Sequence, residues 1–368
     1  MHQSKRIAAF ILLAFLFATE SAPAQPSDVP KSLTDKAGKT DLYGDPLPSG
    51  AIARLGTVRL RHGDGVYSVV FSADGKTLAS SGADEMIRLW DVPTGRESRH
   101  IEGRFEDLVF CKERRSLAMT VRGGAPTRWD IGSAKLVPMR APVKGVTDSA
   151  FSPDGKILAG ALPNKAILLW DAATGNEIHR LTGHSEEVLT LVFSPDGKKL
   201  ASGSNLDDGT VRAWDVESKR QLRQFGKPRM DLTPLGFSPD GKILTVRNDR
   251  NAIVLWDVES GKQVRRLDEE RGLSVRSAAF TSDGRILASG ARDYKHGRLW
   301  VDSIRLWQVS TGKNLRRFTT LGQVNVVTFS PDDKLLAVAG WGNTIHLFDV
   351  RNGKELFTER GHLETVAE

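Results

Sequence analysis

Cysteine is nearly missing from this chain: Cys111 is the single one among 368 residues. One cysteine cannot form an intramolecular disulfide, and no group of cysteines and histidines has the spacing of a zinc site. Because Cys111 follows an apolar run in "DLVFCKE", we expect it to pack as a small hydrophobic residue and not to act as a reactive thiol. The fold must therefore be stabilised by packing.

Recognisable catalytic and nucleotide-binding motifs are missing too. "DGKT" (74–77) and "AGKT" (37–40) lack the earlier glycine of a phosphate-binding loop. "STGK" (310–313) matches the Ser-x-x-Lys pattern of acyl-transferring enzymes, but it occupies the same turn as "PTGR" and "ATGN" elsewhere in the chain. There is neither a His-Glu-x-x-His zinc motif nor an EF-hand loop. We therefore predict no cofactor, no metal and no enzymatic activity.

Long basic runs are absent, although the formal net charge is +7. The paired arginines Arg265–Arg266 and Arg316–Arg317 fall on the outer strands of the repeat described below, and we expect them to be solvated. A modest basic excess without clustered Lys and Arg is a weak signal for nucleic acid. We predict no nucleic-acid partner.

One apolar run, "IAAFILLAFLFA" (7–18), follows the basic stretch "MHQSKR" and precedes small residues at Ala22 and Ala24. This is the layout of a secretory signal peptide. Twelve residues rise about 18 Å as a helix, less than the roughly 30 Å hydrocarbon core of a membrane. We predict a signal peptide at 1–24, cleaved near Ala24, export to the periplasm or the extracellular space, and no integral membrane segment after cleavage; a retained membrane anchor is the alternative. Residues 25–50, rich in proline and aspartate, are expected to form a flexible linker.

What the chain does contain is one unit repeated seven times. Each unit has a phenylalanine followed by a turn of the type "FSPDGK", at Phe71, Phe110, Phe151, Phe193, Phe237, Phe280 and Phe329. Each unit ends in an aromatic residue that aspartate mostly follows: Trp90, Trp129, Trp170, Trp214, Trp256, Trp307 and Phe348. The successive spacings of this aromatic residue are 39, 41, 44, 42, 51 and 41. A period of this size is typical of repeat arrays.

Within one unit, segments such as "YSVVF", "KTLAS" and "MIRLW" are short, rich in β-branched and aromatic residues, and bounded by Asp-Gly or Thr-Gly turns. This pattern predicts antiparallel strands joined by hairpins. About four such strands cannot bury both faces of their sheet, whereas sheets arranged side by side in a ring can. We predict an all-β fold: a seven-bladed β-propeller of four-stranded antiparallel blades over residues 51–360.

Either end of the chain offers a strand that closes the ring. We favour pairing of 52–60 beside 344–349, and the alternative is that 354–361 fills the same outer position. Residues 361–368 are predicted to be a tail, where the sequence looks like the beginning of an eighth repeat.

Phe-Ser-Pro-Asp-Gly followed by a terminal Trp-Asp resembles the WD-repeat β-propellers, over about 52–359, and in style the chain resembles exported bacterial WD-repeat proteins. Complete repeats of that family carry a tetrad of His, Ser or Thr, Asp and Trp, in which a buried indole N–H finds an acceptor. Two units match it: His62, Ser80, Asp84 and Trp90 in the first, and His184, Ser202, Asp208 and Trp214 in the fourth. A Ser-His-Asp hydrolase triad is the alternative. We interpret both sets as structural, because they recur at repeat positions and end on tryptophan.

Four other units depart from the tetrad. Other residues stand at its Ser and Asp positions: Met119 and Gly123, Gly160 and Asn164, Val246 and Arg250, and Val338 and Gly342. We expect these blades to rely on packing alone.

The sixth unit carries an insertion. Eighteen positions separate Ser289 from Trp307, whereas ten separate Ser80 from Trp90. The resemblance places this loop on the face of the ring that carries the tetrad His and Asp. Tyr, Trp and Arg are enriched at interaction hot spots. We therefore predict a hairpin that contacts a partner, together with Tyr67 on the same face, through Asp293, Tyr294, Lys295, His296, Arg298 and Trp300. The alternative is an insert that folds over its own blade with Trp300 packed inward.

Seven structural repeats without a catalytic motif predict a non-enzymatic, monomeric scaffold outside the cytoplasm, which binds a protein partner through its upper-face loops. The rival is a small-ligand-binding or hydrolytic propeller that uses a central channel. The first strands "VYSVVF", "VLTLVF" and "VNVVTF" favour the scaffold, because they are mostly apolar. A third interpretation is the propeller portion of a longer envelope protein.

Overall fold

The computed structural model describes residues 58–111, 116–120, 126–138, 145–270, 273–293, 301–321 and 323–357, together with Asp45. The chain divides into two compact units, Met1–Arg54 and Leu55–Glu368, and the fold below is that of the second. The predicted signal peptide and nearly all of the predicted linker lie outside the described residues, as does the tail at 361–368.

Strands form seven antiparallel sheets, which we number as blades 1 to 7. Blades 1 to 3 consist of β1 (Val66–Phe71), β2 (Thr77–Gly82), β3 (Met86–Asp91) and β4 (Glu97–Glu102); β5 (Asp107–Cys111), β6 (Ser116–Thr120), β7 (Thr127–Asp130) and β8 (Lys135–Pro138); and β9 (Asp148–Phe151), β10 (Ile157–Ala161), β11 (Ile167–Asp171) and β12 (Glu177–Leu181). Blades 4 and 5 consist of β13 (Val188–Phe193), β14 (Lys199–Ser204), β15 (Thr210–Asp215) and β16 (Arg220–Gly226); and β17 (Thr233–Phe237), β18 (Ile243–Arg247), β19 (Ile253–Asp257) and β20 (Gln263–Leu267). Blades 6 and 7 consist of β21 (Leu273–Phe280), β22 (Ile286–Asp293), β23 (Val301–Gln308) and β24 (Asn314–Leu321); and β25 (Val324–Phe329), β26 (Leu335–Gly340) and β27 (Ile345–Asp349).

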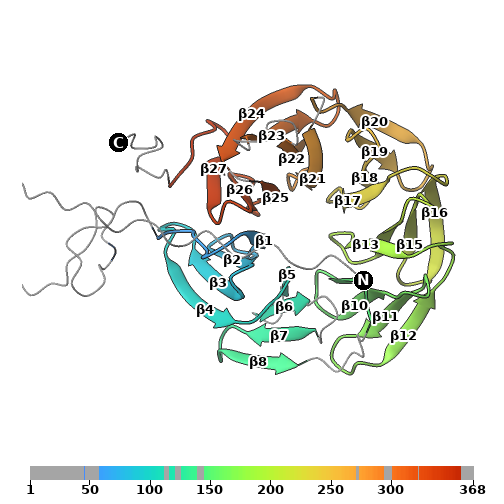
Figure 1. Cartoon of the computed structure of the whole chain (residues 1–368), viewed down its shortest axis with the longest axis horizontal. Helices are drawn as coiled ribbons and strands as arrows, with labels where there is room; N and C mark the ends of the chain where they lie inside the picture. Colours follow the sequence, from blue (N-terminus) through green and yellow to red (C-terminus); the bar gives the residue numbers. More distant parts are fainter. Residues whose placement is uncertain are drawn as a thin grey trace, which may run out of the picture. The chain divides into compact units, whose positions relative to one another are not determined.

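Figure 1 shows the blades around a ring, with the first strand of each blade innermost and the last outermost. The predicted all-β, seven-bladed propeller of antiparallel blades is confirmed. Buried apolar side chains form seven clusters, and each cluster joins two neighbouring blades. In one of them Leu255 of β19 shares a cluster with Val275 of β21. Each sheet thus buries its faces against its neighbours, as the small size of the sheets requires.

The recurrent Ser-x-Asp-Gly turn between the first and second strands has a chemical reason. In blade 1 the Ser72 hydroxyl donates to Asp74 Oδ1 at 2.6 Å, and the same oxygen accepts the N–H of Lys76 at 3.0 Å. Gly75 follows with a φ of +68°, a left-handed conformation that glycine adopts without strain. The same Ser/Thr–Asp contact recurs in blades 3 to 7.

Blade 7 differs from the others because only three strands belong to its sheet. Its outer edge is occupied in two halves. At one end of β27 the N–H of Ile345 donates to the C=O of Leu60 at 2.8 Å, and at the other end the N–H of Leu356 donates to the C=O of Leu347 at 2.8 Å. Segments from both ends of the chain therefore complete this blade, whereas the sequence analysis treated them as alternatives.

The paired arginines of the outer strands are not simply solvated, which corrects our expectation. The second arginine of each pair is exposed, but the first is half-buried and binds the next blade. Arg265 Nη2 donates to the C=O of Ser310 at 2.5 Å, and Arg316 donates to two carbonyls of the turn after β27 at 2.8 and 2.9 Å. Arg99 and Arg223 make the equivalent contact from β4 and β16. We call Arg99, Arg223, Arg265 and Arg316 the arginine clasps.

Candidate functional site

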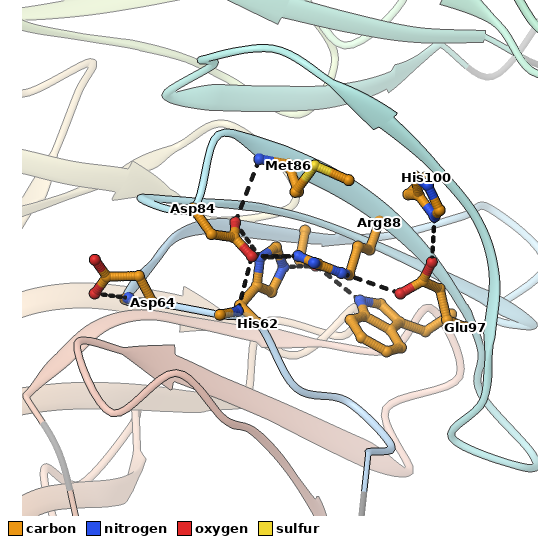
Figure 2. Close-up of polar contacts among 11 residues, drawn as sticks. His62, Asp64, Asp84, Met86, Arg88, Glu97 and His100 are labelled. Carbon is orange, nitrogen blue, oxygen red and sulfur yellow. Dashed lines mark hydrogen bonds and ion pairs between the residues drawn. The ribbon is translucent and has the colours of Figure 1, made fainter. Parts of the chain in front are cut away.

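Blade 1 brings His62, Ser80, Asp84 and Trp90 into one hydrogen-bonded chain. The indole N–H of Trp90 donates to Ser80 Oγ at 2.7 Å, and His62 Nε2 lies 2.6 Å from the same oxygen. His62 Nδ1 lies 2.9 Å from Asp84 Oδ1 (Figure 2). Ser80 and Trp90 are 0% exposed, so the serine oxygen has no access to a substrate. We interpret this set as an internal staple and not as a hydrolase triad.

The charges of this network follow from its burial. Burial lowers the pKa of His62 and outweighs the opposing effect of Asp84, so the imidazole is neutral at pH 7. Burial would raise the pKa of Asp84, but hydrogen bonds from His62, a backbone N–H and Arg88 lower it to about 2. Figure 2 shows the network continuing from Arg88 to Glu97, at 3.0 Å, on the outer strand β4.

Blade 4 holds the second predicted set in the same arrangement. The N–H of Trp214 donates to Ser202 Oγ at 2.8 Å, His184 Nε2 lies 2.7 Å from that oxygen, and His184 Nδ1 lies 3.0 Å from Asp208. All four residues are buried. Burial opposes ionisation of Asp208, but hydrogen bonds from Thr210, a backbone N–H and His184 lower its pKa to about 2.

A third network, which the sequence analysis missed, lies in blade 6. The N–H of Trp307 donates to Ser289 Oγ at 2.9 Å, and the Ser289 hydroxyl donates to Glu269 at 2.5 Å. Glu269 takes the place of the histidine, and Arg305 Nε lies 3.2 Å from its second oxygen. Burial raises the pKa of Glu269, against the opposing effects of Ser289 and Arg305. Ser289 and Trp307 align with Ser80 and Trp90 in the sequence, but a glutamate stands where the family pattern has histidine, so the network was not recognised.

Blades 2 and 5 lack the acceptor, and their indoles show the consequence. Met119 and Val246 occupy the register position of Ser80 on the second strand. The Nε1 atoms of Trp129 and Trp256 are buried without a hydrogen-bond partner. Such an unsatisfied donor costs about 1–3 kcal/mol. These two blades are therefore stabilised by packing without the polar network of blades 1, 4 and 6.

The loops that carry the tetrad His and Asp lie at one end of each blade, which we call the upper face. In blade 1 the N–H of Gly63 donates to Asp84 Oδ2 at 2.8 Å, and the N–H of Ala83 donates to the C=O of Gly65 at 2.7 Å. These contacts join the loop before the first strand to the loop between the second and third strands.

Two aromatic side chains meet on the upper face between blades 7 and 1. The ring of Tyr67 lies 6.0 Å from that of Trp341, edge to face at 87°. Trp341, in the loop between β26 and β27, is 48% exposed. A Cβ at Gly65 would lie 2.8 Å from the Trp341 ring, so this glycine permits the close approach. The sequence analysis named Tyr67 and missed Trp341, although a tryptophan outside the repeat position in "GWGNT" was a usable signal.

The strands that flank the insertion are lengthened, as the hairpin hypothesis requires. β22 and β23 have eight residues each, whereas β2 and β3 of blade 1 have six. Asp293 is the last residue of β22, and its side chain lies outside the described residues. Tyr294, Lys295, His296, Arg298 and Trp300 also lie outside them. Partner binding by this segment stays a prediction.

Two carboxylates stand at the upper end of neighbouring inner strands. Asp107 is the first residue of β5 and Asp148 is the first of β9, and both have the register of Ser68 on β1. Asp148 Oδ2 accepts the N–H of Leu191 on β13 at 2.7 Å. The apolar first strands of blades 1, 4 and 7 were therefore a poor guide to the centre of the ring, because blades 2 and 3 place carboxyl groups there.

These carboxyl groups resist ionisation. Burial, together with repulsion from Asp107 and Glu106, raises the pKa of Asp148 to about 7. Desolvation by the surrounding protein atoms, together with repulsion from Glu106, raises the pKa of Asp107 to about 6. The Asp148 side chain is half-buried, whereas that of Asp107 is open to solvent, which screens the repulsion that it feels.

Within the described ranges, no three His, Cys, Asp or Glu side chains are grouped as a metal site would require. The same part of the chain has no helix that is long and apolar enough to cross a membrane.

Comparison with known proteins agrees with this architecture. The family described as "WD domain, G-beta repeat" matches residues 55–91, 175–215, 261–296 and 312–349. The chain therefore carries WD40 repeats, and with its seven-bladed ring it belongs to the WD-repeat β-propellers.

Similar proteins come from several organisms. The chain is 34% identical over 163 residues to the WD repeat-containing protein SL1-17 of Schistosoma mansoni, covering 43% of this chain and 53% of that protein. It is 23% identical over 268 residues to Protein tipD of Dictyostelium discoideum, covering 70% and 42%. It is 26% identical over 166 residues to Transcription initiation factor TFIID subunit 5 of Caenorhabditis elegans, covering 43% and 25%. The matched segments span about half or less of these relatives. WD-repeat propellers related to the chain are typically protein-interaction scaffolds.

Proposed function

We propose that this propeller is a non-enzymatic protein-interaction scaffold that acts outside the cytoplasm and contacts its partner through the upper-face loops. The observation that carries the proposal is the Tyr67–Trp341 pair. Nearly half of the Trp341 surface is exposed, whereas most tryptophan side chains are largely buried. Tryptophan is also enriched at interaction hot spots, where a partner covers it. The pair lies on the upper face, and in blade 6 the lengthened strands β22 and β23 lead into the insertion.

The tetrads support the scaffold by exclusion. In blades 1 and 4 the Ser, His and Asp side chains that could resemble a catalytic triad are engaged with one another and with a buried indole. These hydrogen bonds hold the upper-face loops in place. The loops therefore stand on a rigid frame, which suits recognition of a partner by loops. Catalysis by these residues would need Ser80 or Ser202 to become accessible.

The test is recovery of bound protein from a periplasmic or culture-supernatant extract on the immobilised chain. We expect Trp341→Ala and a variant without residues 294–300 to recover at least about tenfold less partner, the effect of losing one hot-spot side chain. Leu315→Ala is the matched control, because Leu315 is 47% exposed on the outer strand β24. Equal recovery by all variants would remove the proposal. Fusion of residues 1–24 to a reporter that is active only outside the cytoplasm tests the export.

The second candidate, a small-ligand-binding or hydrolytic propeller, is favoured by one observation, the carboxylates at the centre of the ring. Asp107 and Asp148 have raised pKa values, as catalytic acids often have. Metal analysis of the purified protein and a panel of hydrolase substrates distinguish this candidate. Stoichiometric metal or turnover that Asp148→Asn abolishes would favour it over the scaffold.

A further inference from the structure

The upper face carries acidic groups beside its aromatic pair. Asp64 is exposed in the loop that leads to Tyr67, and Asp107 and Asp148 stand on the inner strands of the next two blades. The Ser81 hydroxyl donates to the C=O of Glu106 at 3.3 Å, which connects blade 1 to the acidic start of blade 2. Blades 7, 1, 2 and 3 thus contribute, in ring order, an aromatic pair and then carboxylates. We call Tyr67, Trp341, Asp107 and Asp148 the acidic-aromatic rim.

In the part of the chain that the structure describes, no lysine or arginine side chain forms a hydrogen bond or ion pair with Asp107 or Asp148. Arg104 precedes Glu106 in the same loop, and Arg276 stands on β21, in blade 6. Neither is among the groups that shift the pKa of Asp107. The described neighbours of Asp148 supply backbone N–H groups and further carboxylates. The chain as a whole has a net charge of +7, so a concentration of negative charge at one place on the ring is a local feature.

Aromatic faces and carboxylates share one kind of ligand. A cationic side chain is attracted to the face of a tryptophan or tyrosine ring, and a carboxylate offers it a charge-assisted hydrogen bond. An anionic or purely apolar segment would leave Asp107 and Asp148 without compensation, at a cost in binding.

We propose that the partner presents a lysine or arginine side chain on a flexible segment, which docks on the acidic-aromatic rim between the Tyr67–Trp341 pair and the carboxylates of Asp107 and Asp148. This inference rests on the proposed function, because it names the chemistry of the partner on the same face. Binding of the cation favours the ionised carboxylates. Since the pKa values of Asp107 and Asp148 are raised to about 6 and about 7, both groups lose their protons between pH 5.5 and 7.5, and affinity increases over this range.

The experiment is selection of binders from a random-peptide phage library on the intact protein, followed by titration of the selected peptides by calorimetry. We expect the peptides to share one basic residue. Asp107→Asn with Asp148→Asn should weaken their binding about tenfold or more, the effect of losing a charge-assisted contact. The matched control is Asp207→Asn with Asp249→Asn, which makes the same charge change on exposed upper-face loops of blades 4 and 5 and should leave affinity within about twofold. Melting temperatures of both double variants verify folding.

The outcomes separate this inference from the proposed function. One contrary result is that the selected peptides lose affinity with Trp341→Ala and yet lack a basic residue, and another is that they bind the Asp107→Asn/Asp148→Asn protein normally. Either result contradicts the proposal of a cationic side chain but not the proposed scaffold function. Peptides indifferent to Trp341→Ala, or a selection without any enrichment of basic residues, count against the rim as a docking surface. An affinity that stays constant from pH 5.5 to 7.5 also contradicts the inference.

Discussion

Removal of one hydroxyl group, by Ser202→Ala in blade 4, should destabilise the propeller strongly. Ser202 Oγ accepts the N–H of Trp214 at 2.8 Å and lies 2.7 Å from His184 Nε2, and none of the three residues is more than 7% exposed. Alanine leaves one buried donor and one buried ring nitrogen without a partner. Each unsatisfied group costs about 1–3 kcal/mol, so the free energy of unfolding should fall by about 2–6 kcal/mol.

The assay is urea unfolding followed by far-UV circular dichroism, with the midpoint and slope compared to the natural protein. Ser204→Ala is the control on the same strand, because its buried hydroxyl makes a single long contact of 3.4 Å with the C=O of Thr210. It should cost less than about 1 kcal/mol. If Ser202→Ala and Ser204→Ala are equally mild, the tetrad contributes little and our account of it is wrong.

A double-mutant cycle isolates the Ser202–Trp214 contact. Trp214→Phe removes the indole N–H, so in the Ser202→Ala protein it removes an unsatisfied donor, whereas in the natural protein it breaks a hydrogen bond. We expect the second substitution to be less harmful in the presence of the first, with a coupling energy of about 1–2 kcal/mol. Additive effects would show that the indole gains nothing from this acceptor.

Further predictions concern pH, the arginine clasps and the orphaned indoles. The pKa of Asp148 is about 7 in the folded protein and 3.8 in the unfolded chain. Because the folded state binds the proton more tightly, the melting temperature should fall as the pH rises between these two values, and Asp148→Asn should reduce that slope. Arg316→Ala should cost about 1 kcal/mol in urea unfolding, whereas Arg220→Ala, at an exposed position of β16, should be neutral. Val246→Thr places a hydroxyl at the register position of Ser80 and should raise the melting temperature if it accepts the Trp256 N–H; a decrease would mean that the hydroxyl itself is unsatisfied.

The repeats made the fold predictable, because the same pattern of strands and turns occurs seven times. Units that lack the tetrad residues still keep this pattern. The two tetrads followed from the resemblance to the WD-repeat family, whose pattern both units match residue by residue, with the serine 18 residues after the histidine in each. Glu269 could not be found in this way, since the carboxylate reaches Ser289 across 20 residues and the family pattern expects histidine there. Its role depends on Arg305, which a sequence motif does not place beside it.

Features between blades were beyond sequence reasoning for a different reason. The clasp from Arg265 to Ser310 spans 45 residues and ends on a backbone carbonyl, which has no sequence signature. Asp107 and Asp148 each begin a strand that reads as apolar, and their proximity depends on how the inner strands are arranged in the ring. Exposure of Trp341 likewise depends on the position of its loop, whereas composition predicts a tryptophan to be largely buried.

The ring is unevenly stabilised, and the contact between blades 2 and 3, which has no arginine clasp, lies at the acidic-aromatic rim. Arginine clasps lead from blades 1, 4, 5 and 6 to the next blade. In blade 2 the outer strand β8 contains no arginine. In blade 3, His179 of β12 takes the register position of Arg99. Blade 2 also lacks a tetrad, and the repulsion between Asp107 and Asp148 acts between blades 2 and 3. A bound cation that offsets this repulsion would stabilise the contact between these two blades, because binding to the folded state alone raises its stability. Amide exchange in β5 and β9 should therefore slow on peptide binding more than in β13 and β17. A uniform change would show that binding at the rim does not stabilise the contact between blades 2 and 3.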